Sequence, residues 1–502
     1  MSTQPTPQET PGAPDRHRRL LILAICCLSL FIVGLDNTVV NVALPAIRRD
    51  LGAPASGLQW IIDAYTLVLA SLLILSGSVA DRIGRRRVFQ TGLVVFVLGS
   101  LLCSLSPSLG WLIGFRALQA VGGSMLNPVA MSIITTTFTD RRERAQAIGI
   151  WGGVVGISMA LGPLIGGFLV DSAGWPAVFL INIPVGLAAC ALTFRYVPES
   201  RAPRPRRLDP VGQVLMVVLL GCGTGAIIEG PGYGWTSPLI LTLIVLALAA
   251  LVCFPLWERR VAEPLIDPRF FRSVPFTGAT VTAVCAFASL GGFLFLNTLY
   301  LQEVRHFSPV QAGLWTLPMA GLTLVMAPIS GRIVGHRGPR LPLVIAGLGM
   351  TASGLLLTRL ADDSSSALLL TAYALFGLGF GLVNAPITNS AVSGMPLAQA
   401  GVAAAVASTS RQIGQSLGVA VIGTVVTASA AASAVAAGGG FTAATHAGWW
   451  IVTGLGLTVL VLGFLTTTPW ATATAARVAA CFDPGPGSGP GGVRGAPAER
   501  LR

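Results

Sequence analysis

Long apolar runs separated by short polar segments restrict the fold of this chain more than any other feature. We count about fourteen such runs between residues 20 and 466, each long enough to cross the hydrocarbon core of a bilayer as a helix. Within lipid, every backbone N–H and C=O group must be paired inside a helix or a closed barrel. The sequence therefore predicts an all-α polytopic membrane protein.

The arginines indicate how this protein lies in its membrane. Charged residues make up only 10% of the chain and the mean hydropathy is +0.75, which excludes an ordinary soluble protein. Lysine is absent, so the net charge of +12 comes from arginine alone. Most arginines fall in the two tails and in alternate connecting segments, a bias typical of cytoplasmic loops. We therefore predict a multi-pass protein of the cell membrane with both termini in the cytoplasm and no nucleic-acid partner.

One of these connecting segments, GSVADRIGRRR at residues 77–87, carries a specific pattern between two apolar runs. Its glycines permit close backbone approach and positive φ, and its acid can accept hydrogen bonds from a helix start. A second copy, GRIVGHRGPR, occupies residues 331–340, with Gly331 and Gly338 in the places of Gly77 and Gly84. The second copy has lost the acid, because Gly335 stands where Asp81 would be. Such a repeat favours a transporter built from two related halves.

This repeat predicts two six-helix bundles with an additional helix pair between them. We expect a cytoplasmic N-terminal tail (1–19), an N-terminal bundle (20–196), a linker that carries the extra pair (197–273), a C-terminal bundle (274–467) and a disordered cytoplasmic tail (468–502). The predicted helices cover residues 20–43, 58–80, 88–105, 111–135, 145–170, 175–194, 211–228, 239–256, 274–300, 312–334, 341–357, 367–386, 402–426 and 449–466.

Ionisable residues inside these helices are candidates for function, because a charge in lipid is costly. Asp36 and Asp63 are expected at similar depth in the first two helices, where a buried carboxyl group can take up and release protons at working pH. A polar helix contact is the competing interpretation for both acids. Arg116 cannot lose its proton, so it must pair or face water, and a structural ion pair is its alternative role. We assign these three residues to proton coupling.

Other polar residues in the helices are candidates for lining a substrate cavity. Arg411 is the second intramembrane arginine, and Glu229 ends the seventh predicted helix, where it could instead sit at the membrane interface. The candidates for this cavity are Asn41, Gln119, Asn127, Glu229, Arg411 and Gln412.

The fifth predicted helix contains closely spaced glycines around a proline, in the order Gly162, Pro163, Gly166 and Gly167. Proline interrupts the helical hydrogen bonds, and glycines allow another helix to approach closely. Small-residue packing alone would produce much of this pattern.

Together, these stretches resemble the fourteen-helix drug:proton antiporter family of the major facilitator superfamily, in its actinobacterial form. In the first half the resemblance rests on LDNTVVNVALP (35–45), QWIIDAYTL (59–67), the 77–87 loop, RALQAVGGSMLNP (116–128), ALGPLIGG (160–167) and WPAVFLINIPVG (175–186). In the second half it rests on LYLQ (299–302), SPVQAGLWTLP (308–318) and RQIGQSLGVA (411–420).

This resemblance implies roles for particular residues. Asp36 would be the acid of the first helix, and Arg116 the arginine linked to proton transfer. The glycines and proline of the fifth helix would be the motif that marks exporters. The conformational-switch loop would comprise Gly77, Asp81, Arg82, Gly84, Arg85 and Arg86.

The sequence favours transport over catalysis. No Walker A loop is possible without lysine, and the histidines and cysteines show no metal or redox spacing, so we expect neither an enzyme nor a cofactor or metal. We expect a monomer that exports a small hydrophobic drug or antibiotic in exchange for protons, by alternating access. An uptake symporter for a nutrient and a non-transporting membrane receptor are the alternatives.

Overall fold

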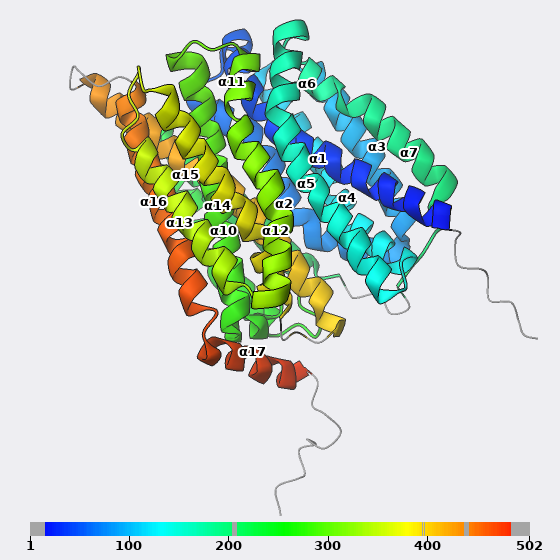
Figure 1. The fold of residues 1–502 in the computed structure, drawn as a ribbon. Coiled ribbons are helices and arrows are strands. Elements are labelled where there is room, and N and C mark those ends of the chain that lie inside the picture. Colours follow the sequence, from blue (N-terminus) through cyan, green and yellow to red (C-terminus); the bar gives the residue numbers. More distant parts are fainter. Residues whose placement is uncertain (1–15, 203–207, 394, 396, 436–440, 483–502) are drawn as a thin grey trace, which may run out of the picture.

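The computed structural model describes residues 16–202, 208–393, 395, 397–435 and 441–482, and Figure 1 shows them as a bundle of helices. Within these residues, 14 helical segments are long and apolar enough to cross a membrane. The expectation of an all-α membrane protein is confirmed.

The N-terminal bundle forms the right-hand part of Figure 1. Here α1 packs against α5, α2 against α4, and α3 against both α4 and α7. Its helices are α1 (Arg16–Leu51), α2 (Ala55–Ile83), α3 (Arg85–Ser104), α4 (Leu109–Thr137), α5 (Arg141–Ala173), α6 (Ala177–Leu180) and α7 (Asn182–Tyr196).

The C-terminal bundle repeats this organisation. In it α10 packs against α15 and α16, α12 against α14, and α13 against α14 and α16. Its elements are the 3-10 helix η1 (Pro268–Arg272), α10 (Val274–Leu299), the π-helical turn η2 (Tyr300–Val304), α11 (Pro309–Trp315), α12 (Leu317–Arg337), α13 (Arg340–Leu357), α14 (Ser366–Val392), α15 (Leu397–Val435), α16 (Phe441–Leu465) and α17 (Pro469–Phe482).

The extra helix pair, α8 (Pro210–Tyr233) and α9 (Pro238–Glu258), lies along the seam between the bundles. Helix α8 packs against α9 and also against α2 and α15, one helix from each bundle. Both helices begin with a proline at the first position after a residue whose side chain caps them, Asp209 for α8 and Ser237 for α9. Such a start satisfies free N–H groups and fixes where each helix begins.

Helix α17 corrects one expectation about the C-terminal tail. Residues from Pro469 to Phe482 form a helix that packs against α10 and η1, where the composition predicted disorder. The hydroxyl of Thr474 accepts a hydrogen bond from the N–H of Val274, which fastens α17 to the start of α10. The rest of the predicted tail, 483–502, and the N-terminal residues 1–15 lie outside the described residues.

The two ends of the molecule differ. Figure 1 shows α6 and α11 at one end and α17 at the other; we call these the α11 end and the α17 end. The bundles meet directly through α2 and α15, and through α5 with α11 and α12. Near the α11 end, Gln302 donates a hydrogen bond to the carbonyl of Val42 at 2.9 Å, and Arg48 pairs with Glu303 at 3.0 Å. The two bundles are therefore joined at the α11 end.

Candidate functional site

A buried ion pair between Asp36 of α1 and Arg116 of α4 lies inside the N-terminal bundle. Arg116 Nη1 is 2.5 Å from Asp36 Oδ2, and both residues are only 1% exposed. The arginine also donates from Nε to the carbonyl of Ile61 at 3.2 Å. Its guanidinium lies over the ring of Tyr65, 4.2 Å from the centroid. The structure thus brings together the acid and the arginine that the sequence assigned to proton coupling.

The second carboxylate oxygen of Asp36 is satisfied by two side-chain amides. Gln119 Nε2 donates to Oδ1 at 2.9 Å, and Asn182 Nδ2 donates to it at 3.0 Å. Ser100 of α3 accepts a hydrogen bond from each of these amides and donates to the carbonyl of Phe179. The carboxylate therefore receives hydrogen bonds from three side chains, which compensates its desolvation.

Two of these residues escaped the sequence analysis, and one received a different role. Asn182 and Ser100 were not predicted, although an asparagine in the apolar stretch 175–186 was a usable signal. Gln119 was assigned to the substrate cavity, whereas here it is fully buried in the Asp36 network. A helix break between α6 and α7 places Asn182 at the start of α7, where its side chain can reach Asp36.

Asp63 lies in different surroundings, on the face of α2 that meets α15 of the other bundle. It is fully buried, and Thr66 donates to its Oδ1 at 3.3 Å. Ser416 of α15 lies beside the carboxyl group, and Asp63 Oδ2 has no hydrogen-bond partner among the described residues. Asp36 and Asp63 thus occupy separate polar sites, one within a bundle and one between bundles.

The residues of the 77–87 loop are held by the segment that follows α7. Asp81 accepts two hydrogen bonds from the Arg85 side chain, at 2.9 and 3.1 Å. Its backbone carbonyl accepts from the N–H of Ala202, and the N–H of Arg85 donates to the carbonyl of Ser200. The loop is therefore held by hydrogen bonds with the segment that connects α7 to α8.

Glu199, in the same segment, contacts the loop at Gly84 and the two arginines after Arg85. Its Oε1 accepts from the N–H of Arg86 at 3.1 Å, and its Oε2 lies 3.6 Å from Arg87 Nε. The side chain of Arg86 donates to the carbonyl of Phe194 at 2.7 Å. Gly84 has φ of +129°, and a Cβ there would lie 2.5 Å from Glu199 Oε1. Only glycine meets both requirements, which explains this position of the motif.

Gly77 and Arg82 are the two remaining residues of the predicted loop. A Cβ on Gly77 would lie 3.7 Å from Pro128 of α4, an ordinary packing contact. Arg82 is exposed at the end of α2.

The glycines of α5 face two different neighbours. A Cβ on Gly162 would lie 2.7 Å from Thr38 Cβ, and one on Gly166 would lie 3.2 Å from Val39 Cα, both in α1. A Cβ on Gly167 would lie 2.8 Å from Val310 Cα, in α11 of the other bundle. These glycines allow α5 to fit between α1 and α11.

Pro163 belongs to the same contact. A Cβ on Gly313 of α11 would lie 2.8 Å from the carbonyl carbon of Pro163. Pro163 also lines a small pocket between the bundles together with Asn41, Asn297 and Thr316. Pro163 and Gly167 therefore form part of the seam near the α11 end, whereas Gly162 and Gly166 pack against α1 within the N-terminal bundle.

The other cavity candidates are dispersed. Asn41 donates to the carbonyl of Asn37 in its own helix. Glu229 accepts a hydrogen bond from Trp60 Nε1 at 2.7 Å, which joins α8 to α2. Asn127 of α4 has a buried side-chain oxygen without a hydrogen-bond partner in the described structure.

Arg411 and Gln412 lie on α15. The guanidinium of Arg411 donates to the hydroxyls of Thr388 and Ser408, at 2.6 and 3.2 Å. The side-chain oxygen of Gln412 is buried and has no hydrogen-bond partner within the described residues.

Comparison with known proteins shows which family this chain resembles. Residues 26–419 match the family model of the Major Facilitator Superfamily. The chain is 38% identical to the multidrug resistance protein Stp of Mycobacterium tuberculosis, over 82% of this chain and 76% of that protein. It is 39% identical to the tetracenomycin C resistance and export protein of Streptomyces glaucescens, over 83% of this chain and 78% of that protein. The puromycin resistance protein of Streptomyces alboniger is also 39% identical, with 85% of each chain covered.

A solved structure shares the fold. A bacterial homologue of the human lysosomal transporter Spinster, in an inward-facing and occupied conformation, superposes with a TM-score of 0.62. That comparison covers 92% of this chain and 98% of the other, at 17% sequence identity. The expected fold and family are thus confirmed, and the chain belongs to the major facilitator superfamily.

Proposed function

We propose that this protein exports a hydrophobic drug or antibiotic across the cell membrane in exchange for protons. Three observations support the proposal. The chain belongs to the major facilitator superfamily, and relatives at 38–39% identity are named for multidrug or antibiotic resistance and export. In addition, an acid that could carry the proton is buried against an arginine in the N-terminal bundle.

The bonding of Asp36 is the observation that carries proton coupling. All three of its side-chain partners donate hydrogen bonds, which is the pattern of an ionised carboxylate. A proton bound to Asp36 would remove the charge that balances Arg116. Because an unbalanced buried charge costs about 3–5 kcal/mol, protonation would favour a rearrangement that gives Arg116 other partners or water. This links proton binding to movement of α4 relative to α1.

The arginine distribution supports placing the α17 end in the cytoplasm and the α11 end outside. In this orientation the contacts of Arg48 with Glu303 and of Gln302 with Val42 close the outer side. Outward opening must break them and reveal the seam lined by α1, α5 and α11. Each proton that enters across 100 mV, negative inside, supplies about 2.3 kcal/mol toward this cycle.

The test uses everted membrane vesicles that contain the full chain. An imposed gradient, acidic in the lumen, should drive a fluorescent lipophilic dye into the lumen, and Asp36→Asn should abolish this accumulation. Asp363→Asn changes an exposed acid and should leave transport unchanged. Dye leaving the vesicles together with protons would support a symporter. Undiminished accumulation in Asp36→Asn, at equal membrane content, would contradict the role of Asp36.

A further inference from the structure

Two buried acids lie together at the α17 end of the extra helix pair. Asp209 precedes α8 and is 5% exposed, and Glu258 ends α9 and is 1% exposed. Neither residue takes part in the Asp36 network or in the contacts between the bundles described above. Their burial requires an explanation, because ionised carboxylates are rarely enclosed without a partner.

One oxygen of each carboxyl group has a structural hydrogen bond. Asp209 Oδ1 accepts from the N–H of Gly212 at 2.9 Å and from Trp257 Nε1 at 3.0 Å. Glu258 Oε2 accepts from the N–H of Ile266 at 3.2 Å. These bonds connect the start of α8, the end of α9 and the segment that leads to η1. They leave Asp209 Oδ2 and Glu258 Oε1 buried without a hydrogen-bond partner in the described structure.

The two unpartnered oxygens face the same small space. A Cβ built on Gly212 would lie 2.5 Å from Asp209 Oδ2 and also 2.5 Å from Glu258 Oε1. The oxygens are therefore separated by at most twice that distance, and glycine leaves room for both of them.

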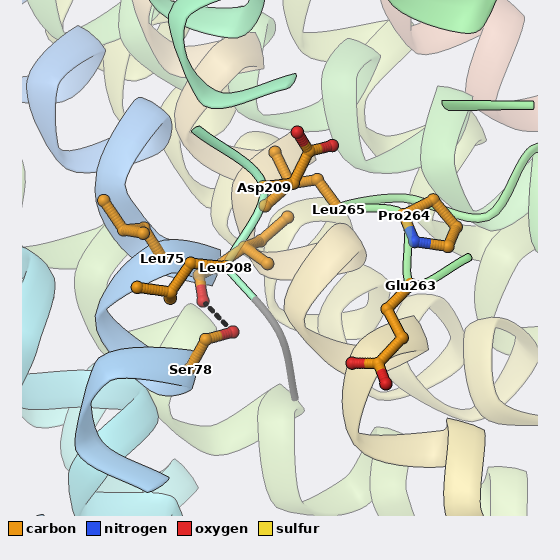
Figure 2. Close-up of a pocket in the computed structure, with 8 residues that line it drawn as sticks. Leu75, Ser78, Leu208, Asp209, Glu263, Pro264 and Leu265 are labelled. Atoms are coloured by element: carbon orange, nitrogen blue, oxygen red, sulfur yellow. Dashed lines mark hydrogen bonds between the residues drawn. The ribbon is translucent and has the colours of Figure 1, made fainter. Parts of the chain in front are cut away.

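The surroundings of the pair supply no balancing positive charge from the described residues. Arg259 and Arg260, which follow Glu258, are both exposed to solvent. Leu75, Leu208 and Leu265 line the adjoining pocket, and Figure 2 shows the carboxylate of Glu263 directed away from that of Asp209. No ion pair of Asp209 or Glu258 occurs in the described part of the chain.

When two buried carboxyl groups share one site, ionisation of both is strongly disfavoured, and one of them keeps its proton. A proton between them provides the one donor that both orphan oxygens lack. A sodium or calcium ion would need further oxygen ligands, whereas among the described residues only the two unpartnered carboxyl oxygens meet beside Gly212. We propose that Asp209 and Glu258 hold one shared proton between Oδ2 and Oε1, which forms a second proton-binding site separate from Asp36.

The shared proton would hold the start of α8 and the end of α9 together. Gln213, next to Gly212, donates a hydrogen bond to the carbonyl of Ser71 in α2 at 2.7 Å, so the start of α8 also holds α2. Loss of the proton would leave two charges in repulsion and weaken this end of the pair. The existence of the site does not rest on the proposed drug export; exposure to cytoplasmic pH follows from the proposed orientation.

Thermal unfolding of the full chain in lipid nanodiscs tests the site. The folded chain keeps a proton that the unfolded chain releases above about pH 5, so stability should fall as pH rises. Glu258→Gln replaces the proton with an amide donor, so its melting temperature should exceed the wild-type value by about 2 °C or more at pH 8.5 and decline less with pH. Glu263→Gln removes a neighbouring acid that does not face the pair and should keep the wild-type pH dependence.

Three results would overturn the proposal. The first is a wild-type pH dependence in Glu258→Gln. The second is stabilisation of the wild type by sodium chloride but not by choline chloride at pH 8.5, which would indicate a cation in place of the proton. The third applies if Glu258→Gln does not fold: the infrared band of a protonated carboxyl group at pH 7 should be present in the wild type and lost in Asp209→Asn, and its equal intensity in both would exclude the shared proton.

Discussion

Asp36 and Arg116 stay inside the protein because neighbouring side chains replace the water that each charge has lost. Amides from α4 and α7 bond the carboxylate, while a backbone carbonyl of α2 and the ring of Tyr65 contact the guanidinium. Four helices thus meet at one ion pair. A change in the charge of Asp36 would therefore alter contacts of all four helices, as coupling of proton binding to helix movement requires.

The loop glycines provide a test at the scale of single residues. Gly84 and Gly338 hold matching places in the repeat, and both have positive φ, +129° and +78°. Glu199 occupies the position of a Cβ on Gly84, whereas nothing lies within 4 Å of one on Gly338. Gly338→Ala should cost about 1–3 kcal/mol from the backbone alone, because its positive φ with ψ of −179° is a conformation that essentially only glycine adopts. Gly84→Ala should cost more and should also slow transport, because it displaces Glu199 from Arg86.

Thermal unfolding and the initial rate of dye transport measure these two variants. The contacts of Glu199 with the loop matter for transport only if the Gly84→Ala variant transports the dye more slowly than the Gly338→Ala variant at equal amounts of folded protein. Equal rates would mean that the loop serves the fold and has no separate effect on the transport cycle.

At the scale of helices, the packing of α5 on α11 predicts how a substitution in α5 changes closure of the seam. Gly167→Val places a branched side chain against the backbone of α11, so the α11 end should close less completely. Gly153→Val in the same helix meets open space and carries the same loss of helix propensity. Cysteines at Arg48 and Glu303 should cross-link readily in the Gly153→Val background and several-fold more slowly with Gly167→Val. Equal cross-linking in both backgrounds would show that this approach of α5 to α11 is unnecessary for closure.

The helices were the most predictable level of this structure. Bilayer thickness sets the length of an apolar run, so the spans follow from composition along the chain. Local interruptions did not follow: the break between α6 and α7, the π-helical turn η2 and the short helix α11 all lie in or beside apolar runs. Helix α17 was missed because alanine and threonine reveal little of the packing that orders them.

The candidate site was predictable only as a set of residues. The cost of burying charge singled out Asp36, Asp63 and Arg116. Their pairing depends on how each helix is rotated, and periodicity does not determine that rotation. Asp209 and Glu258 were not predicted, because an acid at a helix end is usually a cap or an interface residue. Only the fold shows that these two are buried.

At the scale of the whole molecule, the two bundles are held together at the α11 end by contacts of different kinds. The backbone of α5 meets that of α11, and Asp171 of α5 accepts a hydrogen bond from the N–H of Val310 at 3.2 Å. Arg48 reaches both carboxylate oxygens of Glu303 at 3.0 Å. The backbone packing of α5 on α11 does not depend on charge, whereas the pair of Arg48 and Glu303 depends on opposite charges. The pair is therefore the adjustable part of this closure.

Charge reversal separates the contribution of this pair from that of the packing. The side chains are 44% and 29% exposed, so screening limits the attraction to about 0.2–1 kcal/mol. Arg48→Glu should place two acids together and shift the molecule toward opening at the α11 end, and Glu303→Arg should do the same with two arginines. The double variant restores opposite charges and should return the distribution of distances to that of the wild type. Paired spin labels across the seam at the α11 end measure these distributions. If the double variant stays as open as the single ones, the closure depends on side-chain shape at these positions, and the ion pair has no part in setting the balance between the two states.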